Sequence, residues 1–82
     1  MTGSITVYGA TWCGDCLRSK KFLDDHGIAY SWIDTDHDDA ARDYVRSLQN
    51  GGHSIPTIVF EDGSFLVEPS NAELGNKIGV PA

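Results

Sequence analysis

Short runs of β-branched and aromatic residues alternate with longer segments of mixed polarity along this chain of 82 residues. The short runs predict strands over residues 5–8, 29–34, 57–61 and 64–67. The longer segments lack interior proline and predict helices over residues 13–25 and 38–48, with a last short helix ending at residue 78. The predicted order of elements is therefore β-α-β-α-β-β-α.

Turn and capping residues mark the ends of several of these elements. Ser70 and Glu73 have the spacing of a capping box, which predicts that the last helix starts there. Asp62-Gly63 suits a two-residue type I′ turn, so the last two strands should form a hairpin. Aspartates gather at the start of the segment 38–48, where they stabilise a helix N-terminus.

The connections predict how the strands pair. A helix joins the first two strands, so these should be parallel, and the hairpin should add an antiparallel edge. We therefore expect an α/β fold in which a four-stranded mixed sheet carries helices on both faces. No repeat or linker interrupts the chain, and residues 1–82 are expected to form one domain.

The chain is acidic, with 6 Lys and Arg residues against 12 Asp and Glu residues and a net charge of −6. This balance argues against nucleic acid and against an anionic membrane as partners, because both bind basic surfaces. The apolar runs are far shorter than the roughly 18 residues of a membrane span, and the N-terminal segment lacks the regions of a signal peptide. A cytoplasmic location is the expectation.

Cys13 and Cys16 are the two cysteines, and they lie at the expected start of the first helix. A disulfide between them would close too small a loop to stabilise the fold much, and two thiols are too few for a closed zinc site. The histidines are scattered rather than spaced as ligands, so no metal site is expected. Reversible thiol–disulfide chemistry remains, and a Cys-x-x-Cys between a strand and a helix is typical of a thioredoxin-like redox site.

The helix start predicts different roles for the two sulfurs. Unpaired backbone N–H groups there favour a thiolate at Cys13, and the thiolate is the form that attacks disulfides. Cys16 should lie one turn further along, more buried, where it can resolve a mixed disulfide. Asp15 opposes the Cys13 thiolate. We expect its carboxylate to face water at the rim of the site, where it would repel acidic thiols such as glutathione.

TWCGDC at residues 11–16, SIPT at 54–57, the Asp-Gly hairpin and PSNAEL at 69–74 resemble the glutaredoxin branch of the thioredoxin fold. The resemblance runs from Ile5 to Ile78, and within that branch it is closest to the mycoredoxins of actinobacteria. It implies a cis peptide bond before Pro56, Cys13 as the nucleophile and the backbone of Ile55 as a substrate contact. The remaining candidates for substrate binding around the cysteines are Thr11, Trp12, Gly14, Asp15, Ser70 and Asn71.

The resemblance also implies a reaction, the reduction of mixed disulfides between proteins and mycothiol. Cys13 would attack the disulfide, and a second mycothiol, kept reduced by an NADPH-dependent reductase, would regenerate the enzyme. Mycothiolated proteins and mycothiol are then the partners, no cofactor is bound, and a monomer is expected. No Lys or Arg precedes Arg18, and Val67-Glu68-Pro69 replaces the Gly-Gly common before the last helix. Both departures weaken an assignment to glutathione.

Two other functions remain open at this point. A redoxin that receives electrons from thioredoxin reductase and passes them to ribonucleotide reductase would share the fold and both cysteines. An iron–sulfur cluster carrier would instead use a motif cysteine as a cluster ligand.

Overall fold

The computed structural model describes residues 4–81. Its elements are β1 (Thr6–Gly9), α1 (Gly14–Asp25), β2 (Ser31–Asp34), the 3-10 helix η1 (Thr35–His37), α2 (Asp39–Leu48), β3 (Thr57–Val59), β4 (Phe65–Val67) and α3 (Asn71–Ile78). This is the predicted order with η1 added. Within these residues no helix combines the length and the apolar character needed to cross a membrane, and no cluster of three or more His, Cys, Asp or Glu side chains could hold a metal ion.

The four strands form one mixed sheet in the order β2-β1-β3-β4. Strand β1 pairs with β2 in parallel, with Val7 beside Trp32, and with β3 in antiparallel, with Val7 beside Ile58. Strands β3 and β4 form the antiparallel hairpin. The predicted parallel first pair and antiparallel edge are therefore both confirmed.

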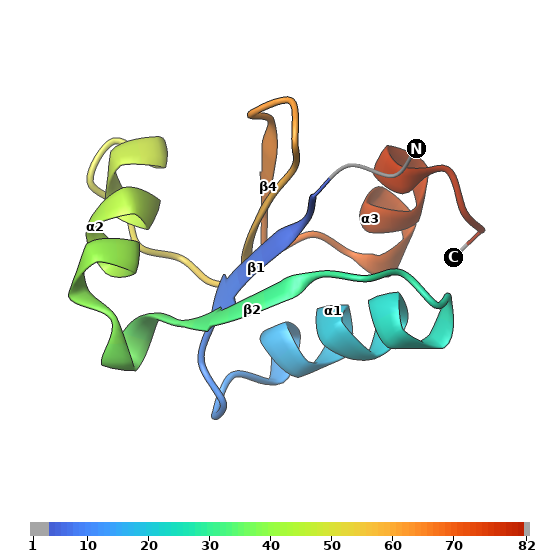
Figure 1. Cartoon of the computed structure of the whole chain (residues 1–82), viewed down its shortest axis with the longest axis horizontal. Coiled ribbons are helices and arrows are strands. Elements are labelled where there is room, and N and C mark those ends of the chain that lie inside the picture. The colour runs from blue at the N-terminus through green and yellow to red at the C-terminus, as the bar shows by residue number, and fades with distance from the viewer. Residues whose placement is uncertain (1–3, 82) are drawn as a thin grey trace.

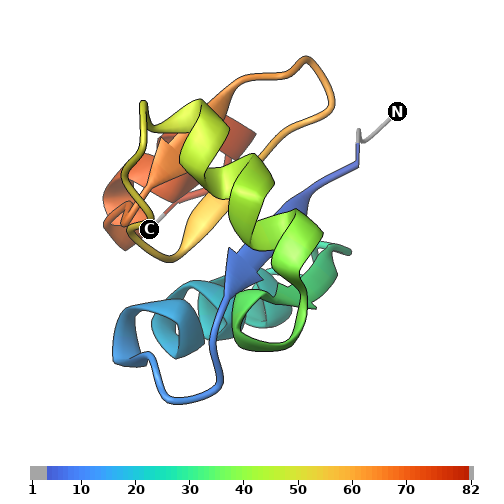
Figure 2. The ribbon, with the colours of Figure 1, turned by 90° about the vertical axis from the view of Figure 1, so that its left-hand side faces the viewer.

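Neighbouring residues of β1 show which helices cover which face of the sheet, because successive side chains point to opposite faces. Val7 is fully buried in a cluster with Leu23 of α1 and Leu74 of α3, so these two helices cover one face. Tyr8 stacks at an angle on Tyr44 of α2, with ring centroids 5.6 Å apart, so α2 covers the other. Figures 1 and 2 show α1 and α2 on opposite sides of β1. The expected α/β fold, a four-stranded mixed sheet with helices on both faces, is confirmed.

The hairpin turn differs from its prediction. The N–H of Phe60 donates to the carbonyl of Ser64 at 2.8 Å, which leaves a loop of three residues, 61–63. A type I′ turn needs a positive φ at both central residues, but of Asp62 and Gly63 it is Gly63 that has one, +87°. Instead, the Asp62 carboxylate accepts the Ser64 N–H at 3.0 Å and so stabilises a wider turn. The prediction of a two-residue type I′ turn was therefore wrong.

Three predicted strands are also shorter than expected, the fourth by one residue because it begins at Phe65. The second begins at Ser31, the partner of Thr6, so residues 29 and 30 lie beyond the ladder of β1. The third ends at Val59, because Phe60 after it closes the loop through its hydrogen bond to Ser64.

Candidate active site

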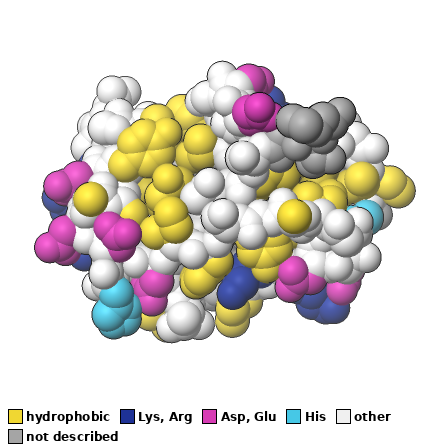
Figure 3. Space-filling model, viewed as in Figure 1, with side chains coloured by type: hydrophobic (Ala, Val, Ile, Leu, Met, Phe, Trp, Pro, Cys, Tyr) yellow, Lys and Arg dark blue, Asp and Glu magenta, His cyan; other side chains and the backbone are white. Residues whose placement is uncertain are grey.

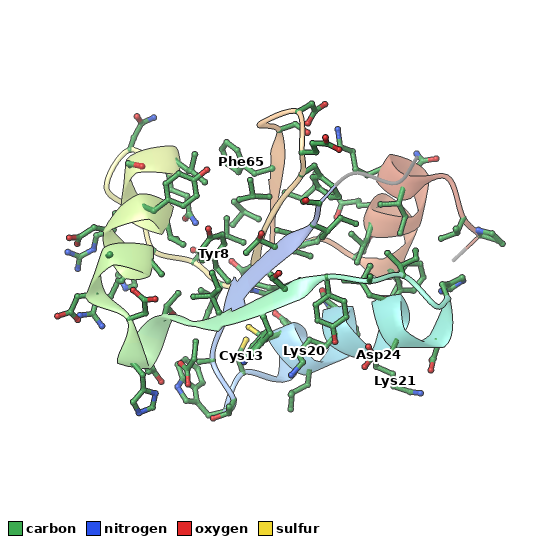
Figure 4. All side chains as sticks on the ribbon, in the orientation of Figure 1. Tyr8, Cys13, Lys20, Lys21, Asp24 and Phe65 are labelled. Atoms are coloured by element: carbon green, nitrogen blue, oxygen red, sulfur yellow. The ribbon has the colours of Figure 1, made fainter. Side chains whose placement is uncertain are left out.

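Cys13 lies directly before α1 and caps its N-terminus. Its backbone is extended, with φ −86° and ψ 114°, and its Sγ accepts the amide N–H of Cys16 at 3.2 Å. The helix thus begins at Gly14, within one residue of the prediction, and the sulfur takes the role that a Ser or Asp oxygen has at most helix starts. This N–H donor holds the sulfur at the positive end of the helix dipole. Figure 4 shows Cys13 at the start of α1.

Cys16 lies one helical turn further on and is fully buried, while Cys13 is 8 % exposed; both are free thiols. Burial, the larger cause, and the hydrogen bond with Cys13 raise the pKa of Cys16 to about 12. Ala10, Trp32 and Ile55 pack around the two sulfurs. At neutral pH Cys16 is therefore a protonated thiol behind a more accessible Cys13.

The segment before β3 brings the backbone of Ile55 beside the nucleophile. The Ile55–Pro56 peptide bond is cis, as the family resemblance implied, and Pro56 is buried. The Cys13 thiol lies 3.9 Å from the Ile55 carbonyl oxygen and points toward it as a weak donor. Of the hydrogen bonds among residues 4–81, none uses the amide N–H of Ile55. This backbone is therefore available to an incoming chain next to Cys13.

Gln49, at the C-terminal end of α2, holds this segment in place. Its amide nitrogen donates to the Ser54 carbonyl at 3.0 Å and to the Thr57 hydroxyl at 2.8 Å, and its amide oxygen accepts the Ser54 N–H at 3.1 Å. Three bonds from one side chain thus clamp both ends of the turn that carries Ile55. Nothing in the sequence pattern singled Gln49 out.

A groove of about 120 Å³ opens beside the cysteines. Trp12 and Ile55 line it, as expected from the resemblance. Its other lining residues, which the sequence analysis missed, are Thr35, Asp36, Arg42, Val45 and His53. The parallel pairing of β1 and β2 was the available signal, because the carboxyl ends of parallel strands meet at one edge. That rule places residues 35–37 beside the loop that carries Trp12.

Asp15 faces water as expected, with 46 % of its side chain exposed, but it has a cation beside it. Its carboxylate accepts from Arg18 at 2.9 Å, and the same guanidinium donates to the Pro69 carbonyl at 3.3 Å. Asp15 is therefore paired with a cation rather than free at the rim, which reduces any repulsion of acidic thiols.

The remaining predicted substrate residues lie outside the groove. Thr11 and Gly14 are exposed at the start of α1, and a Cβ at Gly14 would meet nothing within 4 Å. Ser70 caps α3: its hydroxyl accepts the Glu73 N–H at 3.1 Å and its N–H donates to the Glu73 carboxylate at 2.9 Å, which confirms the capping box. The Asn71 side-chain oxygen is buried without a partner among residues 4–81. A role of these four residues in substrate binding stays a prediction.

Comparison with known proteins agrees with this geometry. The glutaredoxin family model matches residues 5–66. A protein of Mycobacterium tuberculosis named "Putative glutaredoxin Rv3198A" is 41% identical over 78 residues, which cover 95% of this chain and 93% of the relative. Mycoredoxin 1 of Corynebacterium glutamicum is 36% identical over 75 residues, 92% of each chain.

The fold is similar to that of solved structures as well. The crystal structure of the thioredoxin-like protein BC3987 aligns with a TM-score of 0.77 at 30% identity and covers 88% of this chain and 96% of that one. A capped Cys-x-x-Cys at a helix start, a cis-proline segment beside it and a matching family model agree on one conclusion. The chain belongs to the glutaredoxin family and is a thiol–disulfide oxidoreductase.

Proposed function

We propose that this oxidoreductase reduces mixed disulfides between proteins and a neutral low-molecular-weight thiol, mycothiol. The observation that carries the proposal is that most basic side chains around the site already pair with other groups of the chain. Few cations are therefore left to bind an acidic thiol. The similarity to mycoredoxin 1 supports the same choice. The proposal places the enzyme in the cytoplasm, where thiols are kept reduced, as a monomer acting on mycothiolated proteins.

Glutathione carries two carboxylates, so a site that binds it well offers cations that are not already paired. Four of the five basic side chains on α1 and α2 have partners of their own, and the fifth, Arg46, is not among the residues that line the groove. The four partners are Asp15 for Arg18, the Trp32 ring for Lys20, Asp25 for Lys21 and Asp39 for Arg42. Figure 3 shows the same arrangement on one face, with basic side chains next to acidic ones or against apolar surface. A thiol whose polar groups are hydroxyls and amides needs no free cation.

The first step is an exchange at Cys13. Its thiolate attacks the mycothiol sulfur of the mixed disulfide, a Cys13–mycothiol disulfide forms, and the protein thiolate leaves and takes up a proton. The capping N–H of Cys16, 3.2 Å from Sγ, holds the sulfur in place before the attack. The backbone of Ile55 can align an extended substrate beside the sulfur through main-chain hydrogen bonds.

Two routes can release the adduct. A second mycothiol thiolate can attack the mycothiol sulfur, which frees Cys13 and produces mycothiol disulfide for a separate NADPH-dependent reductase. Alternatively, the Cys16 thiolate can attack Cys13, which releases mycothiol and leaves an internal disulfide. Burial raises the pKa of Cys16 to about 12, so little of it is thiolate at neutral pH. We therefore expect the first route to dominate and Cys16 to resolve more slowly.

A Cys16→Ser variant tests this mechanism. With mycothiol, its NADPH-dependent reductase and a mycothiolated protein, it should keep turnover within about twofold of wild type, because the first route bypasses Cys16. A Cys13→Ser control should be inactive. Complete loss of turnover in Cys16→Ser would instead require the internal disulfide. Wild-type turnover with thioredoxin reductase but not with mycothiol would contradict the proposed thiol.

A further inference from the structure

The 3-10 helix η1 is a firmly anchored edge of the groove. The Thr35 hydroxyl donates to the Gly9 carbonyl at 3.2 Å, which ties η1 to the end of β1. Arg42 donates to the Thr35 carbonyl at 3.2 Å, which ties it to α2. The Asp34 carboxylate accepts the Asp36 N–H at 2.9 Å. Asp36 therefore projects from a backbone that is fixed on three sides.

Trp12, which directly precedes Cys13, is much less constrained than η1, because its side chain is 71 % exposed. The one hydrogen bond of its indole is the donation from Nε1 to Oδ2 of Asp36, at 2.6 Å. Trp12 has few packing contacts to orient it, so this bond is the main determinant of where the ring lies. A ring held there forms one wall of the groove beside the nucleophile.

We propose that Asp36 is a positioning and selectivity residue: it holds the Trp12 ring as the wall against which the sugar portion of a neutral thiol packs. This inference rests on the proposed function. The flat indole suits the C–H face of a sugar ring, and the carboxylate oxygen of Asp36 that Trp12 does not use can accept a hydroxyl. His53 lies in the same groove as a further polar partner.

The charges in the groove favour a neutral ligand. Asp36 is acidic, and Arg42, the basic side chain of the groove, already donates to Asp39 and to the Thr35 carbonyl. A thiol that carries carboxylates would therefore meet the charge of Asp36 without a free cation to offset it. The selectivity against acidic thiols that the sequence suggested for Asp15 is thus assigned to Asp36, because Arg18 pairs with Asp15.

Two substitutions separate the hydrogen bond from the charge. Asp36→Ala removes both and should raise the KM for mycothiol about 5- to 10-fold with kcat within about twofold, the scale of one hydrogen bond lost at an exposed position. Asp36→Asn keeps an acceptor oxygen, so its KM for mycothiol should stay near wild type. Because it removes a negative charge from the wall of the groove, its kcat/KM with glutathione should rise about 3- to 10-fold. The control Asp43→Asn removes an exposed carboxylate of α2 outside the groove and should change neither value.

The indole N–H resonance of Trp12 reports the hydrogen bond independently of turnover. Asp36→Ala should shift it upfield and Asp36→Asn should shift it less; Trp12→Phe identifies the signal by its loss. If the bond acts through Trp12, the double variant Asp36→Ala/Trp12→Phe should be no worse for mycothiol than the poorer single variant. An unshifted resonance, or an unchanged KM in Asp36→Ala, would overturn the inference. The proposed function would still stand in that case, provided that the wild-type protein is active with mycothiol. A wild-type protein inactive with mycothiol would overturn both.

Discussion

Replacing Gly9 with alanine tests how closely the buried cysteine is packed. A Cβ at this position would lie 2.6 Å from Sγ of Cys16 and 2.8 Å from Cη2 of Trp32. Neither neighbour can recede easily, because Cys16 is fully buried on α1 and the Trp32 ring has Lys20 4.1 Å from its centroid on one face. The substitution must therefore displace the Cys16 sulfur, the Trp32 ring or the end of β1.

The cost of this displacement follows from two opposing effects. Overpacking a filled core costs about 1–3 kcal/mol, and exchanging a strand glycine for alanine returns about 0.5–1 kcal/mol of backbone entropy. We expect the free energy of unfolding to fall by about 0.5–2 kcal/mol. For a domain of this size, that loss corresponds to a decrease in Tm of about 2–16 °C.

Chemical denaturation with both thiols kept reduced is the suitable measurement. Gly14→Ala is the matched control, because its Cβ would meet nothing within 4 Å. In a helix, alanine is preferred to glycine, so this control should be unchanged or more stable by up to about 1 kcal/mol. A Gly9→Ala protein as stable as wild type would refute the packing argument. A Gly14→Ala protein that loses as much stability as Gly9→Ala would refute it as well.

Two further predictions concern the support of the groove. Gln49→Ala removes all three bonds of the clamp around Ile55 and should lower kcat/KM by about tenfold, because the backbone of Ile55 is then misplaced. The control Ser47→Ala, on the exposed side of α2, should leave kcat/KM unchanged. Equal activities of the two variants would contradict the clamp. His37 donates to Asp34 at 2.9 Å, which raises the pKa of His37 above 6.5 and lowers the pKa of Asp34 below 3.8. The stabilisation from His37 is therefore complete below about pH 6.5 and lost as the pH rises through its raised pKa, while that from Asp34 is lost as the pH falls through its lowered pKa. An NMR titration should place the pKa of His37 above 6.5 in wild type and close to 6.5 in Asp34→Asn; the same value in both would contradict the pairing.

Features that depend on residues three or four apart were predictable. The Cys13 and Cys16 sulfurs differ in burial because the motif spans one turn at a helix start, and Ser70 with Glu73 forms a capping box for the same reason. The parallel and antiparallel pairings followed from the lengths of the connections. The exact turn did not follow, because Asp62 can also bind the backbone two residues on, and this bond competes with the type I′ conformation.

The site as a whole depends on contacts between distant parts of the chain. Trp12 meets Asp36 across 24 positions, Cys13 meets the Ile55 carbonyl across 42, and Arg18 meets the Pro69 carbonyl across 51. The local sequence pattern identifies which atoms can react, because the two cysteines and the helix cap lie within one helical turn. Which side chains surround those atoms depends on how β1, β2 and β3 align in the sheet, and that alignment arises from burying the common core. The reactive pair could therefore be read from six adjacent residues, while the anchoring of Arg18 on the Pro69 carbonyl and the position of Asp36 against Trp12 emerged only from the packed fold.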